Sequence, residues 1–96
     1  MERRKSEPLS NLLSQYLRQE GLETPLAEYR AVEAWPQVVG EPYAALTEEV
    51  VLRGQTLYVR IRSAAARQEL LMKRGYVLQK LNEAAGAHIL YDLRLI

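Results

Sequence analysis

Basic and apolar side chains alternate along residues 55–62, and this pattern predicts the chemistry of the chain. Apolar residues occupy positions 57, 59 and 61, whereas Tyr58, Arg60 and Arg62 occupy the positions that point the other way in a strand. A guanidinium group offers a planar fork of N–H donors that suits phosphate oxygens. A tyrosine ring can stack on a nucleic-acid base. The pattern therefore predicts anion binding rather than bond breaking.

Three more basic residues follow the strand on a predicted helix. They are Arg67, Lys73 and Arg74, and Arg67 and Arg74 lie two helical turns apart. The predicted nucleic-acid-binding residues are therefore Tyr58, Arg60, Arg62, Arg67, Lys73 and Arg74. Simpler interpretations stay open: Arg60 faces Glu49 across a hairpin as a solvated ion pair, and Arg74 lies along the edge of the core with its head in water.

Residues suited to catalysis or metal binding are sparse. The chain has no cysteine, and His88 is its one histidine. A metal site needs several ligands at suitable spacing, and a serine nucleophile needs a nearby base. Glycines do not form a phosphate-cradling loop. We therefore expect no enzymatic activity, no metal and no cofactor.

Length and composition predict one small domain. The chain has 96 residues, is 48% hydrophobic and carries a formal net charge of +1, so nucleic-acid binding would depend on local clusters of charge. Residues 1–6 are predicted to be a basic arm, and residues 7–96 to be the domain. No apolar stretch approaches the roughly 20 residues that span a bilayer. We expect a cytoplasmic protein without membrane contact.

Two helices are predicted in the first half of the chain. One follows Ser6 as N-cap and stops at Gly21; the other starts at Thr24 and Pro25 and ends or kinks at Pro36. Their apolar stripes are predicted to be Leu9, Leu12, Leu13, Tyr16 and Leu17 in the first, and Leu26, Tyr29, Val32 and Trp35 in the second. Trp35 is expected to anchor the core, with Tyr16 and Tyr29 at its edge.

A hairpin is predicted from residue 46 to residue 62, with Gly54 and Gln55 as a type II′ turn. This turn fixes the register. It places Leu52 opposite Leu57, Val50 opposite Val59, Glu49 opposite Arg60, and Val51 opposite Tyr58.

A long helix and a last strand complete the predicted fold. The helix runs from Ala64 to about Asn82 with Gly75 inside it, and the strand covers residues 89–96. The helix is expected to bury Leu70, Leu71, Val77, Leu78 and Leu81. The element order is α-α-β-β-α-β. The predicted fold class is α+β, with helices covering one face of a three-stranded sheet.

Several segments resemble the DciA-like family. The family signature W-x-x-[IV]-[IV]-G is matched by Trp35–Gly40. Its hairpin pattern L-x-x-G-x-L-x-V resembles Leu52–Val59, where the glycine, Gly54, stands one position earlier than in the pattern. The helix that follows is matched by Ser63–Leu70, by Leu81–Glu83 and by Gly86. The resemblance as a whole covers nearly the full chain, from about Leu9 to Leu95, and the order and spacing of these segments make it fairly specific.

This resemblance implies a K-homology-like fold of type II. It also implies a non-enzymatic role in bacterial DNA replication, in which the protein binds DNA and assists loading of the DnaB-type replicative helicase. The implied partners are that helicase and single- or double-stranded DNA. The chain lacks the G-x-x-G loop with which K-homology domains clamp nucleotides. Two alternatives stay open: a protein-interaction module that does not bind nucleic acid, and an RNA-binding domain.

Overall fold

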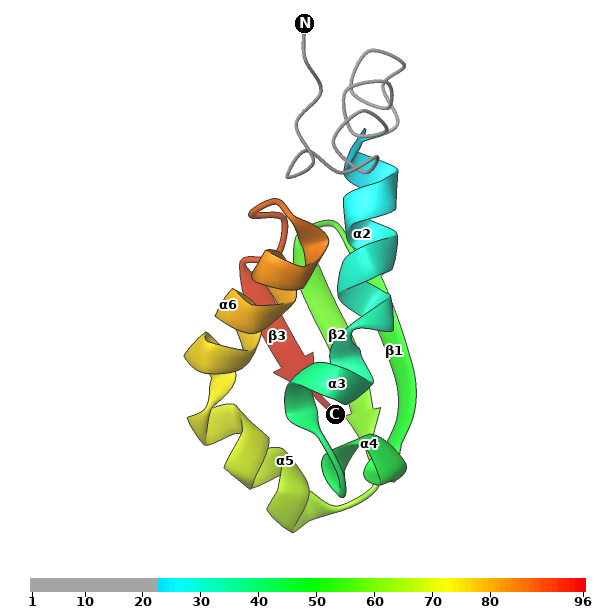
Figure 1. The fold of residues 1–96 in the computed structure, drawn as a ribbon. Coiled ribbons are helices and arrows are strands. Elements are labelled where there is room, and N and C mark those ends of the chain that lie inside the picture. Colours follow the sequence, from blue (N-terminus) through cyan, green and yellow to red (C-terminus); the bar gives the residue numbers. More distant parts are fainter. Residues whose placement is uncertain (1–22) are drawn as a thin grey trace, which may run out of the picture.

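The computed structural model describes residues 23–96. The predicted basic arm and the predicted first helix, with its stripe from Leu9 to Leu17, lie outside the described residues. Figure 1 shows the helices gathered over one face of a sheet. The helices are α2 (Glu23–Glu33), α3 (Trp35–Val39), α4 (Tyr43–Leu46), α5 (Ala64–Met72) and α6 (Arg74–Ala85). The strands are β1 (Thr47–Arg53), β2 (Thr56–Ile61) and β3 (Asp92–Leu95).

The three strands form a mixed sheet in the order β1-β2-β3. β1 and β2 are antiparallel with the predicted register: Leu52 opposite Leu57, Val50 opposite Val59, Val51 opposite Tyr58, and Glu49 opposite Arg60. Gly54 has a φ of 61°, a conformation that glycine adopts without strain and that the predicted turn requires at this position. β3 runs parallel to β2, after the connection through α5 and α6. The α+β class and the three-stranded sheet are confirmed, and the K-homology-like fold stays a prediction.

The core lies between the helices and one face of this sheet. Leu57, Val59 and Ile61 from β2 and Leu93 from β3 are buried on that face. Trp35 is only 1% exposed, which confirms its predicted role as a core anchor. Its indole N–H donates a hydrogen bond of 2.9 Å to Thr47 Oγ1, so the polar atom of this large side chain is satisfied.

Small side chains form the contact between α2 and α6. Ala27 and Ala31 of α2 and Ala85 of α6 are buried, and this lets the two helix backbones lie close together. Arg30 donates from Nη1 to the Ala85 carbonyl oxygen at 3.5 Å. Tyr29 is 61% exposed, so its predicted place at the core edge is wrong. The alanines, rather than the tyrosine, define the buried side of α2.

The predicted helix over residues 64–82 is two helices. Lys73 has φ −105° and ψ 16°, outside helical geometry, and it separates α5 from α6. Ser63 caps α5, with its Oγ accepting a hydrogen bond of 3.1 Å from Ala66 N. Because α6 changes direction after Lys73, Leu71 is 47% exposed instead of buried as predicted. Leu70, Val77 and Leu81 are buried as predicted.

The last strand is shorter than predicted. β3 starts at Asp92, and residues 86–91 form a loop that brings the chain from α6 to the sheet. The Asn82 side chain holds this loop: its Oδ1 accepts hydrogen bonds from Ile89 N and Leu90 N, and its Nδ2 donates to Leu90 O, all at 2.9 Å. These bonds replace strand pairing. Leu90 is buried, so the two-residue alternation fails before Asp92.

Candidate nucleic-acid interface

The face of the sheet opposite the core carries a tyrosine surrounded by arginines. Tyr58 lies at the centre of β2, with Val51 of β1 and Arg94 of β3 as its neighbours in register. Arg53 and Arg60 point to this same side because side chains alternate along a strand. We call Tyr58, Arg53, Arg60 and Arg94 the sheet face. All four side chains are exposed, so an elongated ligand could contact them together.

A shallow hollow lies at the centre of the sheet face. Its lining comprises Glu49, Val51, Arg53, Tyr58, Arg60 and Ile96. Apolar side chains therefore lie beside basic ones, which is the combination that suits a base and its phosphate. The Glu49 carboxylate offsets part of the positive charge.

Arg60 forms the predicted ion pair with Glu49. Its Nη2 lies 3.2 Å from Glu49 Oε1, and both side chains are about half exposed, at 52% and 55%. An exposed pair of this kind contributes little to stability and is easily exchanged for a competing anion. A guanidinium has five N–H donors, and this single contact uses one of them.

Within residues 23–96, Arg62 and Arg67 are held by neutral backbone groups instead of carboxylates. Arg62 donates from Nη2 to the Ala45 carbonyl oxygen in α4 at 2.8 Å. Arg67 donates from Nη1 to the Ile61 carbonyl oxygen. A carbonyl oxygen fixes the position of a guanidinium without cancelling its charge. Both residues therefore present positive charge where β2 ends and α5 begins.

Lys73 and Arg74 lie away from the sheet face, at the junction of α5 and α6. Lys73 Nζ is 5.7 Å from the centre of the Tyr43 ring, within the range of a cation–π contact. The Tyr43 hydroxyl donates a hydrogen bond of 2.5 Å to Glu69 Oε1. This hydrogen bond is the main reason that the pKa of Tyr43 lies above its ordinary value.

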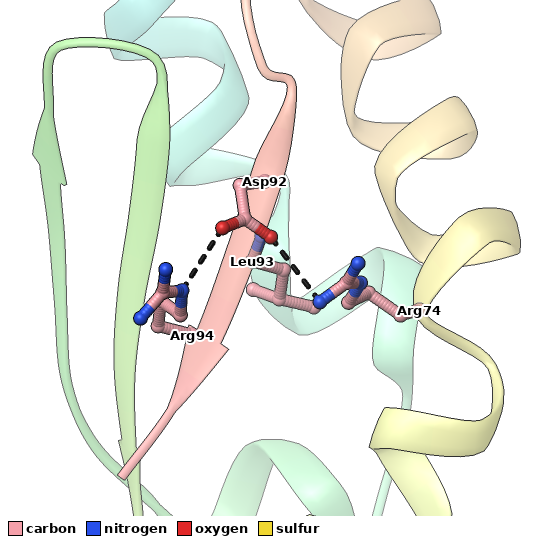
Figure 2. Close-up of polar contacts among 4 residues, drawn as sticks. All are labelled: Arg74, Asp92, Leu93 and Arg94. Atoms are coloured by element: carbon pink, nitrogen blue, oxygen red, sulfur yellow. Dashed lines mark hydrogen bonds and ion pairs between the residues drawn. The ribbon is translucent and has the colours of Figure 1, made fainter.

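Arg74 reaches from α6 to the edge strand β3. Figure 2 shows Asp92 between two arginines, with Arg94 Nε at 2.9 Å and Arg74 Nη1 at 3.2 Å from its two oxygens. Leu93 N also donates to Asp92 Oδ1, at 2.8 Å. The hydrogen bond from Arg94, followed by that from Leu93, lowers the pKa of Asp92, and the pKa of Arg94 rises in return. Arg74 is thus a link between α6 and β3, with about half of its side chain exposed.

The structure divides the six predicted binding residues. Tyr58 and Arg60 lie on the sheet face, Arg62 and Arg67 lie at its end, and Lys73 and Arg74 lie on the helical side. Two residues of the sheet face, Arg53 and Arg94, were missed. Arg53 could have been found from the hairpin register alone. Arg94 could not, because its place beside Tyr58 depends on the pairing of β2 with β3.

No group of three or more His, Cys, Asp or Glu residues in positions 23–96 is arranged to hold a metal ion. None of the helices described in that range has the length and apolar character needed to cross a membrane. His88 stacks on Tyr91, with ring centres 4.4 Å apart and planes inclined by 11°. The single histidine is therefore part of the loop that precedes β3.

The protein is therefore an α+β protein. Helices cover one side of its mixed sheet, and arginines surround a tyrosine on the other side. The sequence model of the family described as "Dna[CI] antecedent, DciA" matches residues 8–95. A UPF0232 protein of Rhodococcus jostii (strain RHA1) is 32% identical over 92 residues, which is 96% of this chain and 49% of that relative. The chain belongs to the DciA family and spans about half the length of this curated relative.

Proposed function

We propose that the protein is a non-enzymatic accessory of DNA replication, which binds single-stranded DNA on its sheet face and assists loading of a DnaB-type replicative helicase. Membership of the DciA family supports the role in replication. The observation that carries the DNA-binding part is the position of Tyr58 among Arg53, Arg60 and Arg94, on the side of the sheet opposite the core.

The sheet face has the two components that non-specific binding of single strands requires. The ring of Tyr58 is 36% exposed and can stack on a base, and every base offers a π-face. The surrounding guanidinium groups can contact the phosphates on either side of that base. Arg62 and Arg67 extend this positive charge past the end of β2. A double helix keeps its bases stacked inside, so a single strand fits this surface better.

The affinity should depend strongly on salt. Neutralising three phosphates of a single strand releases counterions, and this gives a slope of about −2 in a plot of log K against log salt concentration. The net charge of the chain is only +1, so bulk attraction is weak and the local cluster must supply the binding.

Charge reversal at matched positions tests the proposal. Arg60→Glu, alone and with Arg62→Glu, should weaken binding of a fluorescent DNA oligonucleotide measured by anisotropy. Lys80→Glu is the matched control for the single change, because Lys80 is also a half-exposed cation paired with a glutamate, at 3.4 Å from Glu83 Oε1, but it lies on α6. Equal loss of affinity in both single variants would show a bulk charge effect and reject the sheet face. Thermal melting would confirm that each variant folds.

One observation favours a second candidate, a protein-interaction module that does not bind nucleic acid. Arg60, Arg74 and Arg94 all have carboxylate partners, which offset their charge: Glu49 pairs with Arg60, and Asp92 pairs with Arg74 and Arg94. On this alternative, the wild-type protein would show no salt-dependent binding of DNA at either low or moderate salt. RNA binding by the same surface is tested with RNA and DNA of one sequence, because the 2′-hydroxyl is the group that would separate them.

A further inference from the structure

The junction between α5 and α6 exposes apolar side chains that the fold does not use. Leu71 is 47% exposed, Met72 is 81% exposed and Tyr76 is 58% exposed. They fall within six residues of one another, and Gly75 lies among them. We call Leu71, Met72, Gly75 and Tyr76 the elbow patch. Such a concentration of exposed apolar surface is typical of an interaction site.

The break at Lys73 creates this patch. Ala66 and Leu70 of α5 and Val77 and Leu81 of α6 share the buried side of the two helices. The apolar residues between these pairs have no place in the core and project outward. Every residue from Leu71 to Tyr76 is exposed, so these apolar side chains are available for contact with a partner.

Along the chain, the charged residues between Glu69 and Glu83 are all basic. From Leu70 to Asn82 the chain has three basic residues and no acidic one. Arg74 is paired with Asp92, and Lys80 with Glu83. Lys73 makes no ion pair within residues 23–96 and lies against the Tyr43 ring. A partner that is apolar on one side and acidic beside it would complement both features.

The elbow patch continues into an apolar groove along α6. Gly75 and Leu78 line one side of this groove, and Tyr91 and His88 line the other, in a cavity of about 570 Å³. A Cβ atom added at Gly75 would meet no atom within 4 Å, so another chain can approach the helix closely at this point. Glu83 borders the groove further along α6, where Lys80 is its partner. A helix laid across the elbow patch could bury its apolar side in this groove.

The side chains of the patch favour a protein over a nucleic acid. Leu71 and Met72 are aliphatic and have no ring on which a base could stack. Methionine is flexible and adapts to apolar protein surfaces. The one aromatic ring, that of Tyr76, already has the Lys80 ammonium 5.6 Å from its centre. The sheet face has the opposite character, because its central exposed side chain is aromatic.

We propose that the elbow patch docks an acidic amphipathic helix of a protein partner. This assignment rests on the proposed function, which makes the partner the replicative helicase. Contact through Leu71, Met72 and Tyr76 would bury the apolar side of that helix, and Lys73 would face its carboxylates. The protein would then bind DNA and helicase through different surfaces.

Substitution of Met72 by a negative and by a positive residue tests the docking proposal. Met72→Glu and Met72→Lys both remove the methionine packing, and an 81% exposed side chain tolerates both changes in the folded protein. The affinity of the full chain for the purified DnaB-type helicase is measured by biolayer interferometry. Met72→Glu should lower it by about ten-fold or more, as expected at the centre of an interface. Met72→Lys should lower it less, because a lysine attracts the acidic partner.

Two further measurements distinguish other occupants. Titration with the fluorescent DNA oligonucleotide should give wild-type affinity for both Met72 variants; a change that follows the sign of the charge would mean that nucleic acid occupies the patch and would overturn the proposal. Light scattering of the protein alone should give one mass for all variants. A lower mass for Met72→Glu would show that a second copy of the chain occupies the patch.

The outcomes also separate this proposal from the proposed function. If the wild-type protein does not bind the helicase, the proposed function fails and the elbow assignment fails with it. If the wild type binds and both Met72 variants bind equally well, the elbow patch alone is overturned. Arg60→Glu is the positive control, since it should weaken DNA binding and leave helicase binding unchanged.

Discussion

Basic residues lie on the sheet face and beside the elbow patch, but the side chains that accompany them differ. On the sheet face, Arg53, Arg60 and Arg94 surround one aromatic ring. At the elbow, Lys73 lies among exposed aliphatic side chains, of which Met72 is the most exposed. Positive charge alone therefore does not identify a ligand. The neighbouring apolar groups decide between a base that stacks and a protein helix that packs.

The two regions also differ in how they are held. The sheet face rests on strands whose other side forms the core, so its side chains keep a fixed spacing. The elbow patch lies where one helix ends and the next begins, and every residue between the buried Leu70 and Val77 is exposed. We expect changes beneath the sheet to affect stability far more than changes at the elbow.

The largest expected difference is in the free energy of unfolding, when a leucine is replaced by alanine in each of the two regions. Leu93 is fully buried beneath the sheet face, whereas Leu71 is half exposed. Leu93→Ala should lower the free energy of unfolding by about 2–5 kcal/mol, because it removes buried methyl groups and leaves a cavity. Leu71→Ala should change it by about 0.5 kcal/mol or less. Urea unfolding followed by circular dichroism measures both, and similar losses would contradict the difference between the regions.

Removal of one aromatic ring in each region should affect DNA affinity differently, and by less than the stability loss expected for Leu93→Ala. Tyr58→Ala should weaken single-stranded DNA binding by about 1–3 kcal/mol, the contribution of one base stacked on an aromatic side chain. Tyr76→Ala, made at the elbow, should leave that affinity unchanged. Fluorescence anisotropy with one oligonucleotide compares the two variants. An equal loss in both would mean that the division between the surfaces is wrong.

The smallest effect is expected from Asp92, which joins α6 to the sheet. Its pKa is lower in the folded protein than its ordinary value of 3.8, chiefly because of the hydrogen bond from Arg94. A depressed pKa stabilises the folded state above pH 3.8, and this contribution is lost as the pH falls through the folded-state pKa. Asp92→Asn should therefore be less stable than the wild type at neutral pH, and the difference should shrink in acid. Thermal melting across this pH range measures it, with Glu48→Gln, an exposed carboxylate on β1, as a control.

The hairpin was predictable because local signals agree with one another. Gly54 and Gln55 specify the turn, and the alternation on both sides of it sets the register of every pair from Leu52 and Leu57 to Glu49 and Arg60. The exposed ion pair followed directly. By the same reasoning, Arg53 could have been placed beside Tyr58 before the structure was known.

The break at Lys73 was not predictable from the sequence. Leu, Met, Lys and Arg around this position all favour a helix, and Gly75 weakens it only slightly, so local propensity is too weak to place the end of a helix at Lys73. The break arises because α5 must pack against the end of β2 while α6 packs against α2. Tertiary packing decided the direction of each helix, and Leu71 and Tyr76 became exposed as a result.

Two other features were not predicted, for similar reasons: the buried side of α2 and the position of Arg94. The stripe predicted for α2 used its largest apolar residues, but Ala27 and Ala31 form the buried side because α6 lies close to them. Small side chains give a weak signal in a hydrophobic pattern, although they allow the closest contact between helices. Arg94 was missed because a parallel pairing after two helices carries no local signal for its register.

The backbone of Ile96 takes part in the sheet, and this has a practical consequence for anyone who handles the protein. Its N–H donates to the Val59 carbonyl oxygen and its carbonyl oxygen accepts from Ile61 N, both at 2.9 Å, while its side chain lines the hollow beside Tyr58. A fluorophore, bead or purification tag joined at this position would emerge directly beside the surface being assayed. Immobilisation through Ile96 would obstruct DNA binding at the sheet face, so labels are better attached through a residue on another side of the fold.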